Sequence, residues 1–242
     1  MALEKITGIV TDILKYSDRH NVVTLFTRSK GRVPLIAPAG NGKSARMRNA
    51  MLMPLSLISA DVNFNATREM QYLGKFQREK LWKDIYFNPV KSAVSLFIAE
   101  FLDNYIRNSG PDERLWDFSA RAVEILDKSP ENIANFHLAF LIEFSSYAGI
   151  RPDIGGWRED AWFDMRGGAM TIFPPAHRDY LAAADVPFMP QIMRMNLRNF
   201  SHFKMNAAQR RELLKTVLRY FSIHFPGMSS LKSPDVLAEI FG

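Results

Sequence analysis

Lys and Arg side chains near the start of the chain are the groups whose types and spacing suggest a binding chemistry. They gather at expected turns and in one polar loop. Such side chains contact phosphates with an affinity that is independent of base sequence and sensitive to salt. We predict a nucleic-acid contact from eight of them: Lys15, Arg19, Arg28, Lys30, Arg32, Lys43, Arg46 and Arg48. An ordinary solvated surface is the alternative.

The distribution of charge singles out the same segment. Residues 1–80 hold 13 Lys and Arg against 6 Asp and Glu, whereas residues 81–242 hold 18 against 19. The whole formal charge of +6 therefore lies in the N-terminal third. A basic segment joined to a near-neutral body is typical of a protein with a nucleic-acid-binding module.

Two aromatic residues near these cations are candidates for base stacking. Tyr16 lies beside Lys15 in an expected turn, and Phe26 lies two positions before Arg28 on the same strand face. For Phe26 the alternative is a place in the core, which is the commoner fate of Phe in a strand. For Tyr16 an exposed stacking role and a buried position both stay open, because turn residues are less often buried.

The sequence lacks a complete phosphate-loop motif. Gly42, Lys43 and Ser44 fit the end of a nucleotide-binding loop, but that pattern requires Gly at position 37, where this chain has Ala37. The usual strand-to-helix setting is also missing. We therefore expect Lys43 to contact a DNA backbone from a mobile loop.

The sequence also lacks the residue patterns expected of a metal site or of an acid–base catalyst. The five His residues are scattered and none has a metal-ligand spacing: His20, His137, His177, His202 and His224. Asp160 and Asp164 could share a face, but solvated loop carboxylates are commoner than an acid–base pair. The absence of Cys excludes disulfides, Cys-ligated zinc and thiol nucleophiles. We expect no enzymatic activity, no metal and no cofactor.

The basic segment reads as short strands rich in β-branched residues. Apolar runs at residues 6–13, 22–27, 33–36, 51–58 and 70–73 are separated by turn residues and by a polar stretch at 39–49. Five strands within about 75 residues suit a small closed barrel of the OB type. We therefore predict an OB-type DNA-binding domain at residues 1–78.

After residue 77 the apolar period changes to that of helices. The first helix follows Pro89, the second starts near Asp112, and the third starts with Ser129 as N-cap and ends at Gly149. Their predicted inward faces are Val94, Phe97, Ile98, Phe101, Leu102 and Tyr105; Leu115, Phe118, Ala122, Ile125 and Leu126; and Ile133, Phe136, Phe140, Leu141, Phe144 and Tyr147.

Two more helices are expected near the end of the chain. Asn206 and Gln209 form a capping-box pair, and Ser233 starts a last short helix. Their predicted inward residues are Leu213, Leu214, Val217, Leu218, Phe221 and Phe225, then Val236, Leu237, Ile240 and Phe241.

Residues 150–190 lose the helical period and hold a hairpin at about 163–170. The predicted fold class is α+β: a five-stranded OB-type barrel, then a helical domain at 79–150 and 191–242, with a small irregular hairpin subdomain inserted at 151–190.

A basic ridge on the long C-terminal helix is a candidate second site. Three cations recur at i+4 intervals with a fourth beside them, which suits an acidic partner: Arg210, Arg211, Lys215 and Arg219. A solvated helix face is the alternative.

Three sets of residues together resemble the bacterial recombination-mediator family RecO. The first is Gly8-Ile9-Val10, Tyr16, residues 22–27, Gly31-Arg32 and Gly42-Lys43-Ser44. The second is residues 140–144 followed by Gly149-Ile150-Arg151-Pro152-Asp153, and the third is Tyr220-Phe221, His224, residues 231–233 and Val236-Leu237. Each motif is degenerate, but the three occur in the family's order and spacing over the whole chain.

The resemblance implies a mediator that binds single- and double-stranded DNA and anneals strands. It also implies work with RecR, contact with the acidic C-terminal tail of single-strand DNA-binding protein, and help in loading the recombinase. An OB-fold RNA-binding or adaptor protein without a recombination role is the alternative. No run approaches the roughly 18 apolar residues of a membrane helix, so we expect no membrane partner and a cytoplasmic, nucleoid-associated location.

The chain departs from the family at one place. Many members have four Cys that form a zinc site after the Gly-x-x-Pro-Asp turn, where this chain has Gly155, Gly156 and Trp157. We therefore predict a zinc-finger-like insertion without metal, in which aromatic residues fill the space: Trp157, Trp162, Phe163 and Phe173.

Overall fold

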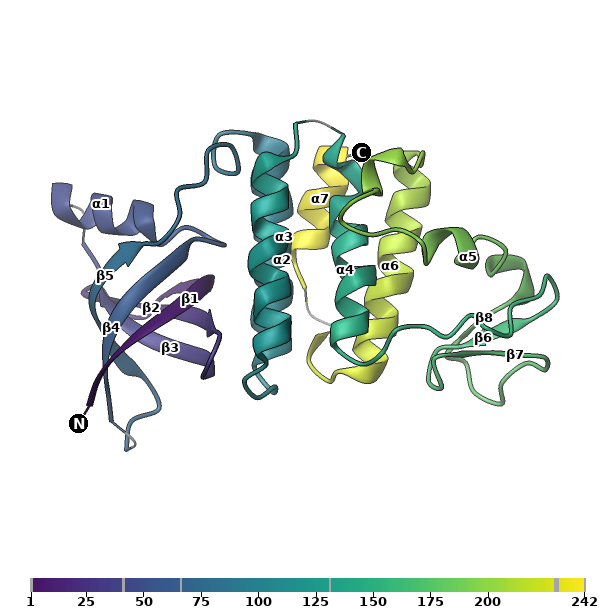
Figure 1. Cartoon of the computed structure of the whole chain (residues 1–242), viewed down its shortest axis with the longest axis horizontal. Helices are drawn as coiled ribbons and strands as arrows, with labels where there is room; N and C mark the ends of the chain where they lie inside the picture. Colours follow the sequence, from purple (N-terminus) through teal and green to yellow (C-terminus); the bar gives the residue numbers. More distant parts are fainter. Residues whose placement is uncertain (1, 41, 66, 131, 229–230, 242) are drawn as a thin grey trace. The chain divides into compact units, whose positions relative to one another are not determined.

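The structure, a computed structural model, describes residues 2–40, 42–65, 67–130, 132–228 and 231–241 (Figure 1). The chain forms two compact units. The first consists of residues 1–130 with 231–240, and the second of residues 131–230 with 241–242. The two units are groups of residues that contact one another, and they do not test where one domain ends and the next begins. The predicted domain boundaries at 78, 150 and 190 therefore stay a prediction.

The first unit begins with a closed five-stranded barrel, which confirms the predicted fold. Its strands are β1 (Ala2–Lys15), β2 (His20–Thr27), β3 (Gly31–Pro38), β4 (Leu57–Phe64) and β5 (Gln71–Arg78). They follow the order β1-β2-β3-β5-β4, with β3 and β5 parallel and the other neighbouring pairs antiparallel. A short helix, α1 (Lys43–Met51), joins β3 to β4.

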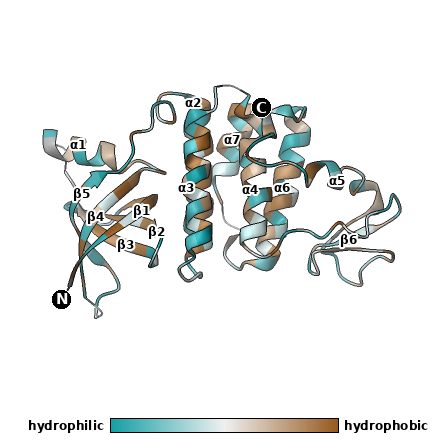
Figure 2. Ribbon diagram, viewed as in Figure 1, coloured by the Kyte–Doolittle hydropathy of each residue, from teal (hydrophilic) through white to brown (hydrophobic). Residues whose placement is uncertain are grey.

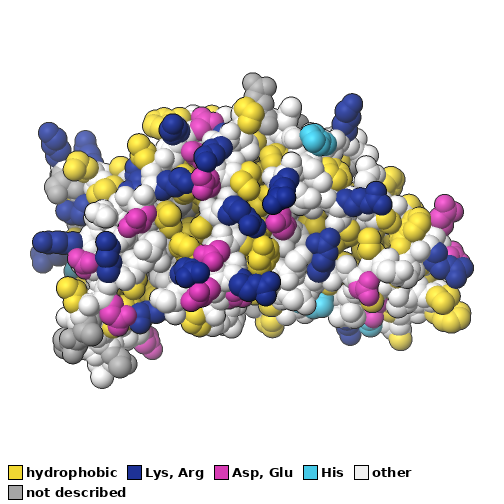
Figure 3. All heavy atoms as spheres, viewed as in Figure 1, with side chains coloured by type: hydrophobic (Ala, Val, Ile, Leu, Met, Phe, Trp, Pro, Cys, Tyr) yellow, Lys and Arg dark blue, Asp and Glu magenta, His cyan; other side chains and the backbone are white. Residues whose placement is uncertain are grey.

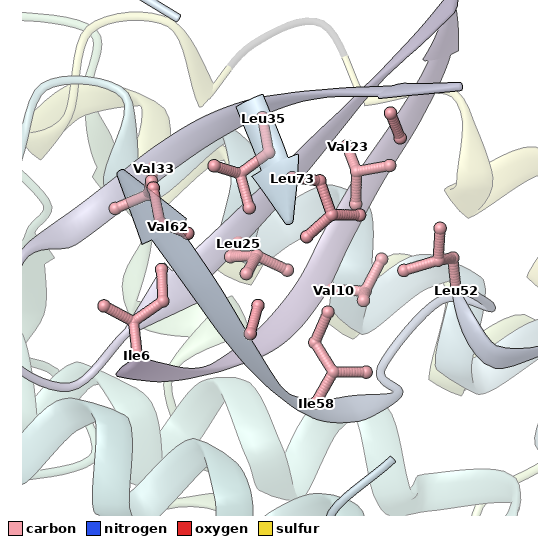
Figure 4. Packing of buried hydrophobic residues seen from close by; sticks show 12 residues of the cluster. Ile6, Val10, Val23, Leu25, Val33, Leu35, Leu52, Ile58, Val62 and Leu73 are labelled. Atoms are coloured by element: carbon pink, nitrogen blue, oxygen red, sulfur yellow. The ribbon is translucent and has the colours of Figure 1, made fainter. Parts of the chain in front are cut away.

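Alternating apolar residues fill the barrel (Figure 4). Val23 and Leu25 of β2 face Leu35 and Val33 of β3, and all four are buried. The same period of two applies to every strand, because successive side chains point to opposite faces. The rest of this core is formed by Ile6, Val10, Ala37, Leu52, Ile58, Ala60, Val62 and Leu73.

The segment between β3 and β4 differs from the prediction in two ways. The polar stretch expected as a mobile loop contains α1, in which Ala45 is the one buried side chain among those that the structure describes, so the sequence shows no apolar stripe there. The apolar run at 51–58 is a strand only from Leu57, because Leu52 and Leu55 instead bury their side chains in a turn. Pro54, which has no N–H to donate to a ladder, is consistent with that turn.

Two long helices complete most of the first unit. The helix α2 (Pro89–Ile106) has Asn88 as N-cap, and α3 (Glu113–Lys128) has Asp112. The predicted inward faces are confirmed except for Tyr105 and Ile125, which are half-buried. Figure 2 shows the apolar side of these helices in brown.

The C-terminal helix α7 (Ser233–Phe241) begins where Glu100 of α2 accepts hydrogen bonds from the backbone N–H groups of Lys232 and Ser233, at 2.9 and 2.8 Å. Leu237 is buried as predicted, whereas Val236 and Ile240 are exposed, so the predicted apolar face was too wide.

The second unit is built around α4 (Phe136–Tyr147), which follows a 3-10 turn, η1 (Ile133–Asn135). The prediction that Ser129 starts this helix is wrong, because Ser129 is the C-cap of α3 and its hydroxyl donates to the Ile125 carbonyl at 2.7 Å. The predicted end is confirmed: Gly149 has a φ of +73°, a conformation that glycine adopts without strain.

The long helix α6 (Ala207–His224) has the predicted capping box between Asn206 and Gln209. Leu214 and Phe221 are buried, while the other four predicted inward residues are half-buried: Leu213, Val217, Leu218 and Phe225. Short elements lie between α4 and α6, namely β6 (Trp162–Asp164), β7 (Ala169–Thr171), β8 (Tyr180–Leu181), η2 (Ala183–Asp185), α5 (Met189–Ile192) and η3 (Phe200–His202).

The predicted hairpin is β6 and β7, and β8 adds a third strand. Phe163 is buried against Met165, Val186 and Tyr220, and Trp162 packs edge-on against Tyr180. Phe173, in contrast, is 78% exposed, so it does not fill the interior. Trp157 is also partly exposed, with its indole N–H donating to the Val186 carbonyl. The prediction of aromatic filling therefore holds for Phe163 and fails for Phe173.

No helix among the described residues combines the length and hydropathy needed to cross a bilayer. Within the same residues, no group of three or more His, Asp or Glu side chains is placed to hold a metal ion.

Candidate nucleic-acid interface

The outer surface of the barrel is divided by α2. This helix contacts β1, β2 and β3, and it covers the part of the surface around Thr24 and Phe26, which are both buried. On the other part, outward side chains are exposed or half-buried. We call this part the open face; it consists of Leu14, Tyr16, His20, Val22, Ile36, Pro38 and Tyr72.

Phe26 cannot act as a stacking platform, so this candidate is wrong. Its side chain is 1% exposed, and the indole N–H of Trp116 in α3 donates to its carbonyl at 2.8 Å. The core alternative applies, because helices cover this end of the strand. Tyr16, in contrast, is 59% exposed on the open face.

Arg28 is held by two carboxylates of α3. Its guanidinium donates to both oxygens of Asp117 at 3.0 and 3.1 Å, and it lies 3.2 Å from Glu113. The hydrogen bonds to Asp117 raise the pKa of Arg28 and lower the pKa of Asp117. The bidentate geometry connects the barrel to α3.

Three more of the candidate cations have intramolecular partners. Lys30 binds Glu4 at 2.9 Å and lies over the Phe64 ring. Arg32 lies 3.7 Å from the buried carboxylate of Asp103 in α2, and Lys15 binds Asp18 at 3.0 Å. These partners reduce the charge that the side chains offer to a phosphate, although the exposed pair of Lys15 is weak.

Arg19, Lys43 and Arg46 remain exposed and have no carboxylate within ion-pair distance among the residues that the structure describes. Arg19 lies in the β1–β2 turn, and its carbonyl accepts from the N–H of Ala39 at 2.8 Å. The turn therefore lies beside the segment that leads to α1, where Lys43 and Arg46 are one helical turn apart. Arg48 is half-buried and interacts within the protein.

Sequence reasoning missed three residues of the barrel. Tyr72 is 55% exposed on β5, the guanidinium of Arg68 lies 5.4 Å from its ring centre, and Lys75 is exposed on the same strand. The alternation of buried Gln71 and Leu73 with exposed Tyr72 was a readable signal. Figure 3 shows Lys and Arg side chains projecting from the barrel and α1.

An acidic group borders the open face on β1. Burial and then the charge of Asp103 raise the pKa of Asp12, while Arg107 and Arg32 lower it. Asp103 itself binds Arg107 at 2.7 Å. The negative charge at this border is therefore matched by neighbouring guanidinium groups, and the unmatched positive charge lies toward Arg19 and α1.

The predicted ridge on α6 is mostly occupied by internal contacts. Arg210 donates to Asn135 and to the Met205 carbonyl, and burial lowers its pKa. Lys215 binds Glu212 at 2.8 Å, and Arg219 binds Asp179 at 3.0 Å. Arg211 is exposed. Spacing alone did not reveal these partners, which come from other elements as well as from α6.

A cavity of about 660 Å³ lies beside α6 within the second unit. Its walls come from α4, α5, α6 and the segments that connect them, and they are mainly apolar, with Lys204, Gln209 and Glu212 among the polar lining residues. The apolar lining includes Leu141, Met189, Met193, Leu213, Val217 and Phe221. Such a concave apolar site with a few polar groups is typical of ligand or peptide binding.

Comparison with known proteins covers almost the whole chain. Residues 1–78 match the family model "Recombination protein O N terminal", and residues 86–234 match "Recombination protein O C terminal". Proteins called DNA repair protein RecO are similar over nearly their full length. Those from Bacteroides fragilis and Phocaeicola vulgatus are 31% and 30% identical, with 99% of each chain covered. The one from Porphyromonas gingivalis is 30% identical with 97% covered. The chain therefore belongs to the RecO family of DNA repair proteins.

Proposed function

We propose that this protein is a recombination mediator that binds DNA through the barrel and acts by binding and annealing strands, without catalysis. The cations that carry the contact are Arg19, Lys43 and Arg46, with Arg68 and Lys75. In this role it would work with RecR at the nucleoid and help to load the recombinase onto DNA coated by single-strand DNA-binding protein.

One observation carries the DNA-binding part of the proposal. Several of the basic residues near the barrel are neutralised by carboxylates, but Arg19 in the β1–β2 turn and Lys43 and Arg46 in α1 are exposed without such partners in the described chain. A set of unmatched cations on one side of a barrel attracts a polyanion, and each phosphate contact releases counterions.

Fluorescence anisotropy with a labelled single strand across a salt series tests this. The triple substitution Arg19→Ala, Lys43→Ala and Arg46→Ala should weaken binding and flatten the dependence of affinity on salt. A matched control removes the same charge elsewhere in the first unit, from the exposed residues Lys83, Arg114 and Lys128. Equal losses in both triple variants would mean that net charge alone drives binding, and would contradict this site.

We further propose that the cavity beside α6 receives the acidic, hydrophobic-ended tail of single-strand DNA-binding protein. The apolar walls suit the hydrophobic end, and Lys204 in the lining can pair with an acidic residue. Arg211 and Lys215 both point away from this side, since they follow Gln209 by about 200° and 240° around the helix. This revises the ridge predicted from spacing.

A labelled tail peptide tests the second site. Lys204→Glu and Val217→Asp should each abolish peptide binding, whereas Lys215→Glu and Arg211→Glu on the other side of α6 should leave it nearly unchanged. A peptide that binds all four variants equally would exclude this cavity. Annealing of complementary strands coated by single-strand DNA-binding protein should fail in the same variants that lose the peptide.

A further inference from the structure

Four outward side chains form a continuous apolar row across the barrel. The strand register aligns Leu14 with Val22, Val22 with Ile36, and Ile36 with Tyr72. Because neighbouring strands are about 4.8 Å apart, the row is roughly 14 Å long. We call these four residues the apolar row.

The apolar row lies outside the core. Residues that adjoin the row on β2, β3 and β5 point inward and are buried: Val23, Leu35 and Leu73. In the row itself, Leu14 is 60% exposed and Tyr72 is 55% exposed, while Val22 and Ile36 are half-buried. Outward positions of such a strand are normally polar, so an exposed apolar row indicates a contact surface.

Tyr72 is held with one face covered by Arg68. The turn that carries Arg68 is fixed by the amide of Gln71, which donates to the carbonyls of Asn65 and Arg68 at 3.1 and 2.8 Å and accepts from the N–H of Asn65. The fixed turn places Arg68 so that its guanidinium lies over the ring, 5.4 Å from the ring centre. One covered face and half of the side chain exposed leave a surface on which a flat group can stack.

Charge decides which occupant fits the apolar row. Arg68 lies at the Tyr72 end of the apolar row. At the Leu14 end, the chain continues through Tyr16 into the β1–β2 turn, which contains Arg19. The N–H of Tyr16 donates to the His20 carbonyl across this turn. A chain with flat apolar groups and regularly spaced negative charges matches this arrangement. An unpaired nucleic-acid strand has both, whereas a duplex keeps its bases stacked inside.

We propose that the apolar row contacts the bases of an unpaired strand, that Tyr72 stacks with one base, and that Arg68 supports the ring and reaches the adjoining phosphate. The proposal rests on the proposed function, since it assumes that the barrel binds DNA, and it assigns the preference for unpaired strands to Tyr72. The exposed cations supply affinity for any strand, paired or not.

Three probes of equal length separate the contributions: an oligothymidylate, an abasic strand and a duplex. Tyr72→Ala should weaken oligothymidylate binding about tenfold, the size expected from the loss of one stacked base. It should leave the abasic strand, the duplex and the salt dependence unchanged. Tyr72→Phe keeps the ring and should restore binding, and Leu14→Ser at the other end of the apolar row should weaken it selectively as well.

Phe87→Ala is the matched control, because Phe87 is an exposed aromatic residue of the first unit outside the open face. The proposal is overturned if the wild type binds the oligothymidylate no tighter than the abasic strand, or if Tyr72→Ala weakens all three probes equally. Both results leave DNA binding by the barrel intact. A wild type that binds none of the probes overturns the proposed function as well.

Discussion

Arg28 and Asp117 are 89 residues apart in the chain and form a bidentate ion pair between the β2–β3 turn and α3. This contact changes the expected role of a basic residue in the barrel. Arg28 was a candidate for phosphate binding, yet its fork of N–H donors is already directed at a carboxylate. Its position in the structure makes it a connection between the barrel and the helices of the first unit.

Replacing Arg28 should therefore affect stability more than DNA affinity. Arg28→Ala is expected to lower the melting temperature measurably while changing the affinity for single-stranded DNA little. Arg46→Ala should do the opposite, because Arg46 is exposed and without a carboxylate partner in the described chain. Thermal denaturation and fluorescence anisotropy of both variants check this. If Arg28→Ala lost as much DNA affinity as Arg46→Ala, Arg28 would contact DNA after all.

Gly74 is required by the close approach of β5 to β4. A side chain at this position would overlap the carbonyl oxygen of Asp61, where the β4–β5 register shifts. Gly74→Ala should therefore destabilise the protein by about 1–3 kcal/mol, the usual cost of overpacking. Gly42→Ala is the control, since nothing lies within 4 Å of its added carbon. Urea denaturation should separate the two variants, and equal midpoints would contradict the steric argument.

Lys91 and Asp84 should respond unequally to substitution. Lys91 is 1% exposed, and its ammonium binds Asp84 at 2.6 Å and the Asp127 carbonyl at 2.9 Å, whereas the side chain of Asp84 is 44% exposed. Asp84→Ala leaves a buried charge without its partner and should cost about 3 kcal/mol. Lys91→Met leaves only a solvated carboxylate and should cost about half as much.

Urea denaturation of the two single variants and the double variant measures this asymmetry. The double variant should be no less stable than Asp84→Ala alone, because the buried ammonium that lost its partner Asp84 has been removed as well. If Lys91→Met is the more damaging change, packing of the lysine stem matters more than its charge.

The barrel was predictable because its signal is local. Val23 and Leu25, or Val33 and Leu35, alternate within one strand, and that period is enough to predict half-buried strands. The prediction failed where the pattern breaks. The run in β5 seemed to end at Leu73, because Gly74 and Lys75 interrupt it, and this shortened strand concealed the significance of Tyr72.

The availability of the candidate cations was not predictable. Lys30 pairs with Glu4, Arg32 with Asp103 and Arg28 with Asp117, and each contact joins segments far apart in sequence. No periodicity encodes such pairs, so spacing could not separate these residues from Arg19 or Arg46. The same holds for the i+4 ridge of α6, where Asp179 binds Arg219 and Asn135 binds Arg210 from other parts of the chain.

The last prediction concerns His137, which is fully buried in α4 and whose ring stacks on Phe241 at 5.7 Å. Burial, with a smaller effect of the Arg210 charge, lowers its pKa from 6.5 to about 3. Above pH 6.5 the imidazole is neutral in both the folded and the unfolded chain, so it adds no dependence on pH. Below that value the unfolded chain binds a proton that the folded chain does not.

The free energy of unfolding should therefore fall as the pH falls from 6.5 toward 3, with His137 contributing up to about 1.4 kcal/mol per pH unit. Urea denaturation at a series of pH values measures the slope. His137→Leu should reduce the slope over that range relative to the wild type and leave it unchanged above pH 6.5, where neither state binds this proton. Parallel slopes for the two proteins below pH 6.5 would show that the folded protein takes up the proton on His137, and would contradict its burial as a neutral imidazole.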